Sequence, residues 1–226
     1  MGAGVLAIWH EVDDGFDAEL VRWYDAEHHP ERVAIEGFRQ GSRYAAITGS
    51  PRYFVYYETA SPEVMESAGY RARVDFPTSW TRDVMAHYRK TVRTVFEVAG
   101  SRGTAAGPYA ATFRLQARHG CPMSAWRDGA RALAARALAA HADAAGPADG
   151  VAVWVRAGQP VTVNSEQAIR GRDGQADVAV VAWAASLAGL DAAAAGLRER
   201  LAGERWVGCL AAGRYLHQRT HKAGQN

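Results

Sequence analysis

Residues 23–44 read WYDAEHHPERVAIEGFRQGSRY, and this stretch contains the end of a helix, a glycine stop and the start of a strand. Apolar and aromatic side chains recur at helical spacing from Phe16 onward, and Gly37 is typical of a helix end. Pro30 is expected to break or restart the helix, because proline cannot donate a backbone hydrogen bond. Residues 38–48 then favour an extended conformation, so the stretch predicts a helix that turns directly back into a strand.

The flanking segments complete one β-α-β-β-α-β unit. Residues 4–12 favour a strand that stops at the turn Asp13-Asp14-Gly15, and Gly49-Ser50-Pro51 predicts a hairpin turn. Ser61-Pro62-Glu63 predicts a helix start with Ser61 as its N-cap. The expected strands are 4–12, 38–48, 52–59 and 88–98, and the expected helices are 16–36, 61–72 and 80–86. This order is the split βαβ pattern of ferredoxin-like folds.

The same order returns after a Gly/Ala/Ser-rich stretch that reads as a linker. Strands are expected at 109–118, 150–157, 177–186 and 205–217, helices at 123–142 and 190–201, and a long polar loop at 158–175. The two halves share almost no residue identity, so the repeat is inferred from element order. The predicted organisation is a first repeat at 1–100, a linker at 101–108 and an Ala-rich second repeat at 109–226.

A ferredoxin-like sheet carries helices on one face, so its other face must be covered by something else. A second copy of the sheet in the same chain would cover it. The predicted fold class is therefore α+β: two tandem ferredoxin-like repeats whose antiparallel sheets pack as an intrachain dimeric α/β-barrel. Such a chain would be a monomeric pseudo-dimer or would pair further as a homodimer.

Composition excludes several functional classes. The formal net charge is +2 and the arginines are scattered, so nucleic acid is not an expected partner. Cys121 and Cys209 are too sparse for a disulfide framework or a zinc site. The apolar stretch 176–190 is too short to cross a bilayer and the first residues lack signal-peptide character, so no membrane partner and a cytoplasmic location are expected.

The densest group of chemically competent side chains lies around His28. An imidazole titrates near neutrality, and a neighbouring carboxylate such as Glu27 can fix its tautomer. His28, Glu27 and Tyr24 are therefore the candidate catalytic residues. The competing interpretation is a solvated helix end at which His28 faces water, and water is the expected environment of His29. Adjacent histidines on a helix diverge, so they do not predict a metal site.

Tyrosines and arginines in the first half are candidates for contact with a ligand. Strand alternation places Tyr53, Val55 and Tyr57 on one face of residues 52–59, and Phe54, Tyr56 and Glu58 on the other. A row of tyrosines suits a flat aromatic or polyketide-like ligand, and the alternative for each tyrosine is plain core and interface packing. The candidate substrate-binding residues are Trp23, Arg43, Tyr44, Tyr57, Tyr70 and Trp80. Arg43 would either pair with Glu58 or bind a carboxylate or phenolate, and Tyr70 and Trp80 lie on the segment that would cover the cleft.

A helix with Trp-Tyr, an acidic residue and His28-x-Pro30, followed by Gly37-Phe38 at the next strand, resembles the dimeric α/β-barrel superfamily. Its EthD-like proteins, polyketide cyclases and small monooxygenases imply a cleft between the helices and the concave sheet face. By position, His28 corresponds to the histidine of this motif. The resemblance implies chemistry without a cofactor. A separate branch binds heme, but the second-half histidines that could serve, His119, His141 and His217, lie near element ends.

Two functions follow from these residues. The first is a cofactor-independent cyclase, isomerase or monooxygenase that acts on a small aromatic or polyketide-like compound, with His28 as general acid or base. The second is a non-catalytic protein that binds a hydrophobic small molecule or serves as a scaffold. Because the acids, histidines and tyrosines gather in the first half, the sequence predicts one functional cleft with the second half as its structural partner.

Overall fold

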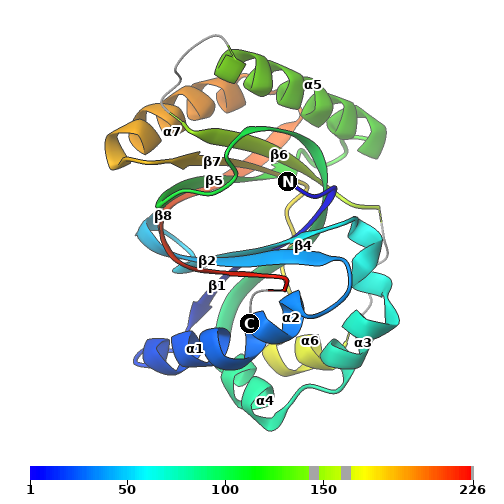
Figure 1. The fold of residues 1–226 in the computed structure, drawn as a ribbon. Helices are drawn as coiled ribbons and strands as arrows, with labels where there is room; N and C mark the ends of the chain where they lie inside the picture. Colours follow the sequence, from blue (N-terminus) through cyan, green and yellow to red (C-terminus); the bar gives the residue numbers. More distant parts are fainter. Residues whose placement is uncertain (143–147, 159–163, 225–226) are drawn as a thin grey trace.

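The computed structural model describes residues 1–142, 148–158 and 164–224, and its strands form a closed antiparallel barrel in the order β1-β3-β2-β8-β5-β7-β6-β4 (Figure 1). The strands are β1 (Gly4–Val12), β2 (Phe38–Gly49), β3 (Tyr53–Thr59), β4 (Tyr88–Gly103), β5 (Tyr109–Ala117), β6 (Gly150–Arg156), β7 (Val178–Ala184) and β8 (Val207–Lys222). Closure removes free sheet edges, which would otherwise expose unpaired backbone groups. The predicted α+β barrel class is thereby confirmed.

Helices cover the barrel on two opposite sides (Figure 1). Those on the first side are α1 (Asp17–Trp23), a π-helical turn (Tyr24–His28), α2 (His29–Val33), a 3-10 turn (Pro62–Glu66), α3 (Ala68–Asp75), α4 (Ser79–Ala86) and α6 (Ser165–Arg170). The opposite side carries α5 (Met123–Ala142) and α7 (Leu187–Ala202). α6 is therefore exceptional, because it belongs to the second half of the chain but contacts α3 and α4 of the first. No helix in the described part of the chain combines the length and apolarity needed to cross a membrane.

The barrel consists of two four-stranded sheets with the same internal order. The first half contributes β4-β1-β3-β2 and the second contributes β8-β5-β7-β6. The two sheets join where β2 pairs with β8 and where β4 pairs with β6. One face of each sheet is thus turned inward, toward the other sheet.

Aromatic rings from both halves fill the barrel interior. Trp9 stacks on Phe54 with ring centroids 5.1 Å apart, and its indole Nε1 donates to Thr112 Oγ1 of the second half at 3.1 Å. Trp154 and Trp183 pack beside them and are fully buried. Side chains at every second position of β1 and β3 supply this core, as the period of a strand dictates. The alternate positions face the helices, and this is where polar side chains gather.

Several local expectations were wrong at element boundaries. Residues 62–66 form a 3-10 turn without a Ser61 side-chain cap, and α3 begins later, where Ser67 Oγ accepts from the backbone N–H of Tyr70 at 3.2 Å. β4 continues to Gly103 because its end pairs with β6. Part of the polar loop expected at 158–175 forms the helix α6. A tertiary partner determines the end of β4, whereas local side-chain caps determine the starts of α3 and α6.

The packed barrel interior predicts a large cost for removing one of its rings. Trp154→Ala is expected to lower the free energy of unfolding by about 3–5 kcal/mol, because the cavity cannot fully collapse. Phe76→Ala is the matched control: Phe76 is 82% exposed, so the change should stay within about 0.5 kcal/mol. Urea denaturation measures both values, and equal costs would contradict a packed interior.

Candidate functional site

The helix that runs from Asp17 to Val33 contains a π-helical turn at Tyr24–His28, a feature that often occurs at functional sites. Within this turn His28 stacks on the indole of Trp23 with ring centroids 4.1 Å apart. His29 turns toward the sheet, where its ring lies 5.2 Å from that of Tyr57. The turn therefore directs two adjacent histidines into the interior.

The burial of His29 corrects the expectation that it faces water, since it is fully buried. Gly41 on β2 makes the space: a Cβ there would lie 2.6 Å from the ring of Tyr57 and 3.2 Å from Nδ1 of His29. Only a residue without a side chain allows both rings to approach the sheet this closely. His28 is also buried, at 6% exposure, so the solvated interpretation of this histidine is wrong as well.

A chain of hydrogen bonds connects β4, the π turn and β1. Tyr88 OH donates to Tyr24 OH at 2.7 Å, and Tyr24 OH lies 3.2 Å from Nε2 of His10. His10 Nδ1 lies 3.1 Å from the carbonyl oxygen of Glu11, which can only accept. We therefore assign the proton of His10 to Nδ1, so that Tyr24 donates to Nε2. Both Tyr24 and His10 are held in fixed orientations by this chain.

Other buried polar atoms close to this chain lack partners. In the described part of the protein, His28 Nδ1, both ring nitrogens of His29, Tyr57 OH and Arg32 Nη1 have no hydrogen-bond partner. A buried polar group without a partner costs about 1–3 kcal/mol. Unpartnered groups gathered on one face of a sheet are the arrangement expected where a polar ligand binds.

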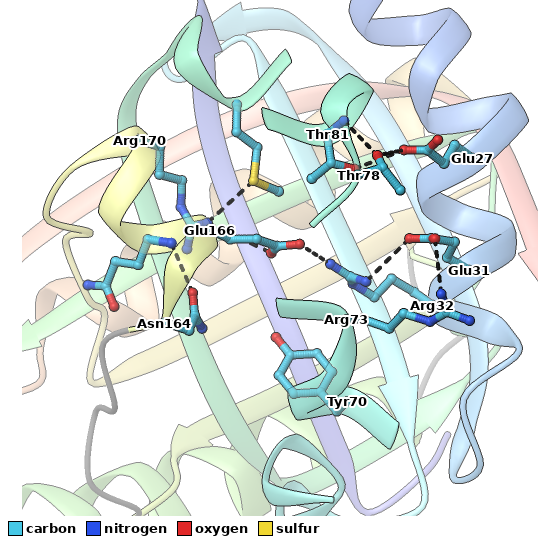
Figure 2. A network of polar contacts seen from close by, with 12 residues as sticks. Glu27, Glu31, Arg32, Tyr70, Arg73, Thr78, Thr81, Asn164, Glu166 and Arg170 are labelled. Atoms are coloured by element: carbon cyan, nitrogen blue, oxygen red, sulfur yellow. Dashed lines mark hydrogen bonds and ion pairs between the residues drawn. The ribbon is translucent and has the colours of Figure 1, made fainter. Parts of the chain in front are cut away.

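The helix α6 of the second half closes this region (Figure 2). Its Glu166 forms a buried ion pair with Arg32, and Arg170 pairs with Asp173 at 2.7 Å. Arg170 Nη1 also lies 3.7 Å from the sulfur of Met85 on α4. Sequence reasoning missed Glu166 and Arg170. The signal was present: Asn164 and Gln167 have the spacing of a helix cap, and the Asn164 side chain accepts from the Gln167 backbone N–H at 2.9 Å.

Glu27 does not orient His28. Its carboxylate accepts hydrogen bonds from Thr78 at 2.7 Å and from Thr81 at 2.9 Å, and so attaches the π turn to α4. Thr81 in turn accepts from the indole N–H of Trp23 at 3.1 Å. The adjacency of Glu27 and His28 in sequence suggested a pair, but neighbouring helical side chains point in different directions.

The remaining candidate residues are distributed over several environments. Arg43 is buried and pairs with Asp25 at 2.8 Å, rather than with Glu58. Tyr44 lies in the barrel interior, on the opposite face of the sheet from His28. Tyr70 lies 5.8 Å from the guanidinium of Arg32, and Trp80 is half-buried with its indole N–H bonded to Glu19 at 2.7 Å. The helix-facing site thus contains Trp23, Tyr24, His28, Tyr57 and Tyr70 together with Arg32 and Glu166.

Burial determines the charge states of the cluster. Burial, and next the positive charge of Arg32, hold the pKa of His28 well below its usual value, so this imidazole is neutral at pH 7. Burial raises the pKa of Tyr57, which therefore keeps its proton and can donate it in a hydrogen bond. Burial also lowers the pKa of His10 to about 3. The site offers neutral imidazoles and phenols beside a paired arginine.

A cavity of about 180 Å³ borders the cluster at Tyr70. It lies between α3, β4 and the segment that carries α6, and its polar lining includes Arg93, Arg156 and Asn164. Arg93 donates to Tyr70 OH at 2.6 Å on the cavity side. The guanidinium of Arg32 lies 5.8 Å from the centre of the same ring, so Tyr70 contacts both the cavity lining and the buried cluster. Tyr70 therefore stands at the boundary between solvent and the buried site.

The described residues contain no metal-binding group, and those of the second half leave no open cleft for a heme. Among residues 1–142, 148–158 and 164–224, no group of three or more His, Cys, Asp or Glu could hold a metal ion. The space between the second-half helices and their sheet is filled by an apolar core that includes Leu133, Val180 and Leu190. His119 is exposed and His217 lies 2.8 Å from Thr220, whereas the side chain of His141 lies outside the described part.

No protein-family model matches the sequence, and a search of curated proteins returns no match. Solved structures do resemble it. An anthrone oxidase-like protein aligns over 98% of this chain and 93% of its own length, with TM-score 0.66 and 15% identity. A proposed monooxygenase from Lactobacillus acidophilus NCFM aligns over 98% and 97%, with TM-score 0.60 and 8% identity. A proposed monooxygenase from Fusobacterium nucleatum subsp. nucleatum aligns over 100% and 97%, with TM-score 0.61 and 5% identity. These likenesses show the dimeric α/β-barrel fold.

The buried neutral histidine predicts a pH-dependent stability. Between the pKa of unfolded His10, 6.5, and its folded value of about 3, the unfolded chain binds a proton that the folded chain does not. The free energy of unfolding therefore falls as pH drops below about 6.5, by about 1.4 kcal/mol per pH unit for one such histidine. His10→Asn should reduce this slope by that amount between pH 6 and pH 5. The exposed His119 provides the control, because His119→Asn should leave the slope unchanged; equal slopes for both variants would disprove the assignment.

Proposed function

We propose that this chain is a cofactor-independent enzyme that removes a proton from a small aromatic or polyketide-like compound and directs its oxygenation. The observation that carries the proposal is the set of buried, unpartnered polar atoms on His28, Tyr57 and Arg32. The structural neighbours are named as an anthrone oxidase-like protein and two proposed monooxygenases. These names favour oxygenation over cyclisation or isomerisation as the proposed reaction.

His28 is the proposed general base. Its Nδ1 has no hydrogen-bond partner and its ring is neutral, so in the tautomer protonated on Nε2 the Nδ1 lone pair is available to take a proton. The ring stacks on Trp23 and meets Tyr24 edge to face at 5.5 Å, and these contacts fix its orientation. A fixed base needs no reorientation when the substrate arrives.

Arg32 and Tyr57 would stabilise the anion that proton removal creates. A guanidinium and a phenolic O–H are both donors, and in a water-poor site such donors favour a developing enolate or phenolate strongly. The positive charge that lowers the pKa of His28 would thus also stabilise the product of the proton transfer. Tyr24 and Glu27 act as positioning residues, through His10 and through α4 respectively.

The oxygenation can be written without a cofactor. A CH₂ group activated by an adjacent aromatic carbonyl loses one proton to His28, and the resulting carbanion gives electrons to O₂. One oxygen atom then becomes a new carbonyl on the substrate, and the other leaves as water with the two hydrogens of the CH₂ group. Cyclases and isomerases share the first step, so proton removal is the more general part of the proposal.

The architecture supports a second element of the proposal: the chain is two fused ferredoxin-like repeats, at 1–100 and 109–226, joined by 101–108. The identical strand order of the two halves supports this reading. A fused pair already contains both sheets of the barrel and needs no partner copy. The repeats are unequal, because the second contributes α6 to the site of the first.

Oxygen uptake with a panel of anthrones tests the proposed reaction. Wild-type protein should consume O₂ and form the matching anthraquinone, and His28→Gln should lower kcat by about 10²-fold or more, the usual contribution of a general base. His119→Gln, on an exposed loop, should retain full kcat. Deuterium incorporation from D₂O at the acidic carbon measures proton removal alone. Full exchange and uptake by His28→Gln would exclude His28 as the base.

A non-catalytic binding protein is the second candidate. The observation in its favour is that Glu166 and α6 close the polar cluster from solvent. Tight binding of an aromatic compound without oxygen uptake or deuterium exchange, in wild-type protein, would favour this candidate over the enzyme.

A further inference from the structure

The ion pair between Arg32 and Glu166 connects the two halves at the edge of the polar cluster. Both side chains are buried, with 3% and 7% of their surfaces exposed. Glu166 extends from α6 and Arg32 from α2, and the two side chains meet between these helices (Figure 2). Figure 2 shows the guanidinium of Arg32 between Glu166 on one side and Glu31 on the other.

Only one of the two terminal nitrogens of the Arg32 guanidinium has a hydrogen-bond acceptor among the described residues. Its Nη2 donates to Glu166, but its Nη1 has no hydrogen-bond partner in the described residues and lies 3.8 Å from the Glu31 carboxylate. Tyr57 OH and His28 Nδ1 are also unpartnered. A buried arginine near unpartnered polar atoms is an arrangement that binds an anion. Here the carboxylate of Glu166 already occupies one side of the guanidinium.

We propose that Glu166 occupies the place of a carboxylate on the substrate, and that an aromatic carboxylate displaces Glu166 and α6 from Arg32 when it binds. The inference rests on the proposed function for the position of the site, and adds the chemical class of the substrate.

The charges around α6 favour such an exchange. Arg170 has its own partner in Asp173 at 2.7 Å, and its contact with Glu166 is longer, at 4.0 Å. All three residues lie on the same segment, so they can move together without losing the pairing of Arg170. The cation that loses its partner is Arg32. Opening without a ligand would leave this buried guanidinium with only its longer contact to the Glu31 carboxylate, at 3.8 Å and without a hydrogen bond, which is unfavourable.

A carboxylate on the ligand restores the pairing of Arg32, whereas a neutral ligand does not. The exchange of one carboxylate for another on the same arginine leaves the number of buried ion pairs unchanged. Binding of a neutral analogue has to proceed with Glu166 still in place, or with Arg32 left only its 3.8 Å contact to Glu31. The site should therefore discriminate between an aromatic acid and its amide even though the two have nearly the same shape.

Calorimetric titration with 2-naphthoate and 2-naphthamide tests this inference on the full chain. Wild-type protein should bind the acid at least 10-fold more tightly than the amide. Glu166→Ala and Glu166→Gln remove the competing carboxylate, so each should bind the acid at least 10-fold more tightly than wild type, with less than a 2-fold change for the amide. Glu166→Gln preserves the size of the side chain, and so remains informative if Glu166→Ala fails to fold.

Two arginine variants and one control complete the design. Arg32→Gln should abolish the preference for the acid, and Arg32→Lys should retain part of it because the charge remains. Glu31→Gln is the matched control: this carboxylate also approaches Arg32 but is 21% exposed, and the preference should change less than 2-fold. Equal affinity for acid and amide in wild type and in the Glu166 variants, or no binding of either, would overturn the inference.

The two proposals can fail separately. A preference for the acid that depends on Arg32, without oxygen uptake or deuterium exchange, supports the carboxylate site and contradicts the enzyme. Oxygen uptake that depends on His28, with equal binding of acid and amide, supports the enzyme and contradicts the carboxylate site.

Discussion

The closure of the barrel is the constraint on which the rest of the structure depends. β2 pairs with β8 and β4 pairs with β6, so two sheets with the same strand order become one surface without edges. Each sheet then has an inner face directed at the other sheet. Trp9, Phe54, Trp154 and Trp183 fill the space between these faces, so the polar cluster of the first half lies on an outer, helix-covered face.

The two outer faces differ because their helices differ. On the second half, α5 and α7 pack Ala and Leu side chains against a sheet rich in Val. On the first half, the π turn directs His28 and His29 inward, and Gly41 leaves room for them beside Tyr57. The polar atoms buried there are a cost in stability that simple core packing would avoid. The ion pair from Glu166 to Arg32 then makes the second half a direct participant in the site.

Much of the barrel was predictable from the sequence because local patterns determine it. Alternation in residues 53–59 correctly separated Tyr57 from Tyr56. Gly37 marked the turn before β2, but the helix already ends at Val33. Local sequence patterns failed to predict side-chain burial and hydrogen-bond partners that depend on residues distant in the sequence. His29 is buried because Gly41, on another element, makes space for it, and Glu27 binds Thr78 and Thr81 from α4 rather than its neighbour His28.

The largest omission concerned the polar segment between β6 and β7. Its composition indicated a solvated loop, but Glu166 and Arg170 are satisfied by Arg32 and by Asp173 and are therefore buried. Charged residues are buried only when they are paired, and the partner of Glu166 lies 134 residues away in sequence. Long-range pairing of this kind leaves no local pattern, although the Asn164 cap did mark the start of α6.

The central claim is that the helix-covered face of the first half is a ligand site. A crystal structure of the protein with 2-naphthoate tests it most directly. The account predicts the carboxylate within hydrogen-bonding distance of Arg32, the rings beside His28 and Tyr57, and Glu166 moved away from the guanidinium. A naphthoate bound elsewhere, for example beside Arg93 and Arg156, with the pair between Arg32 and Glu166 intact, would contradict it.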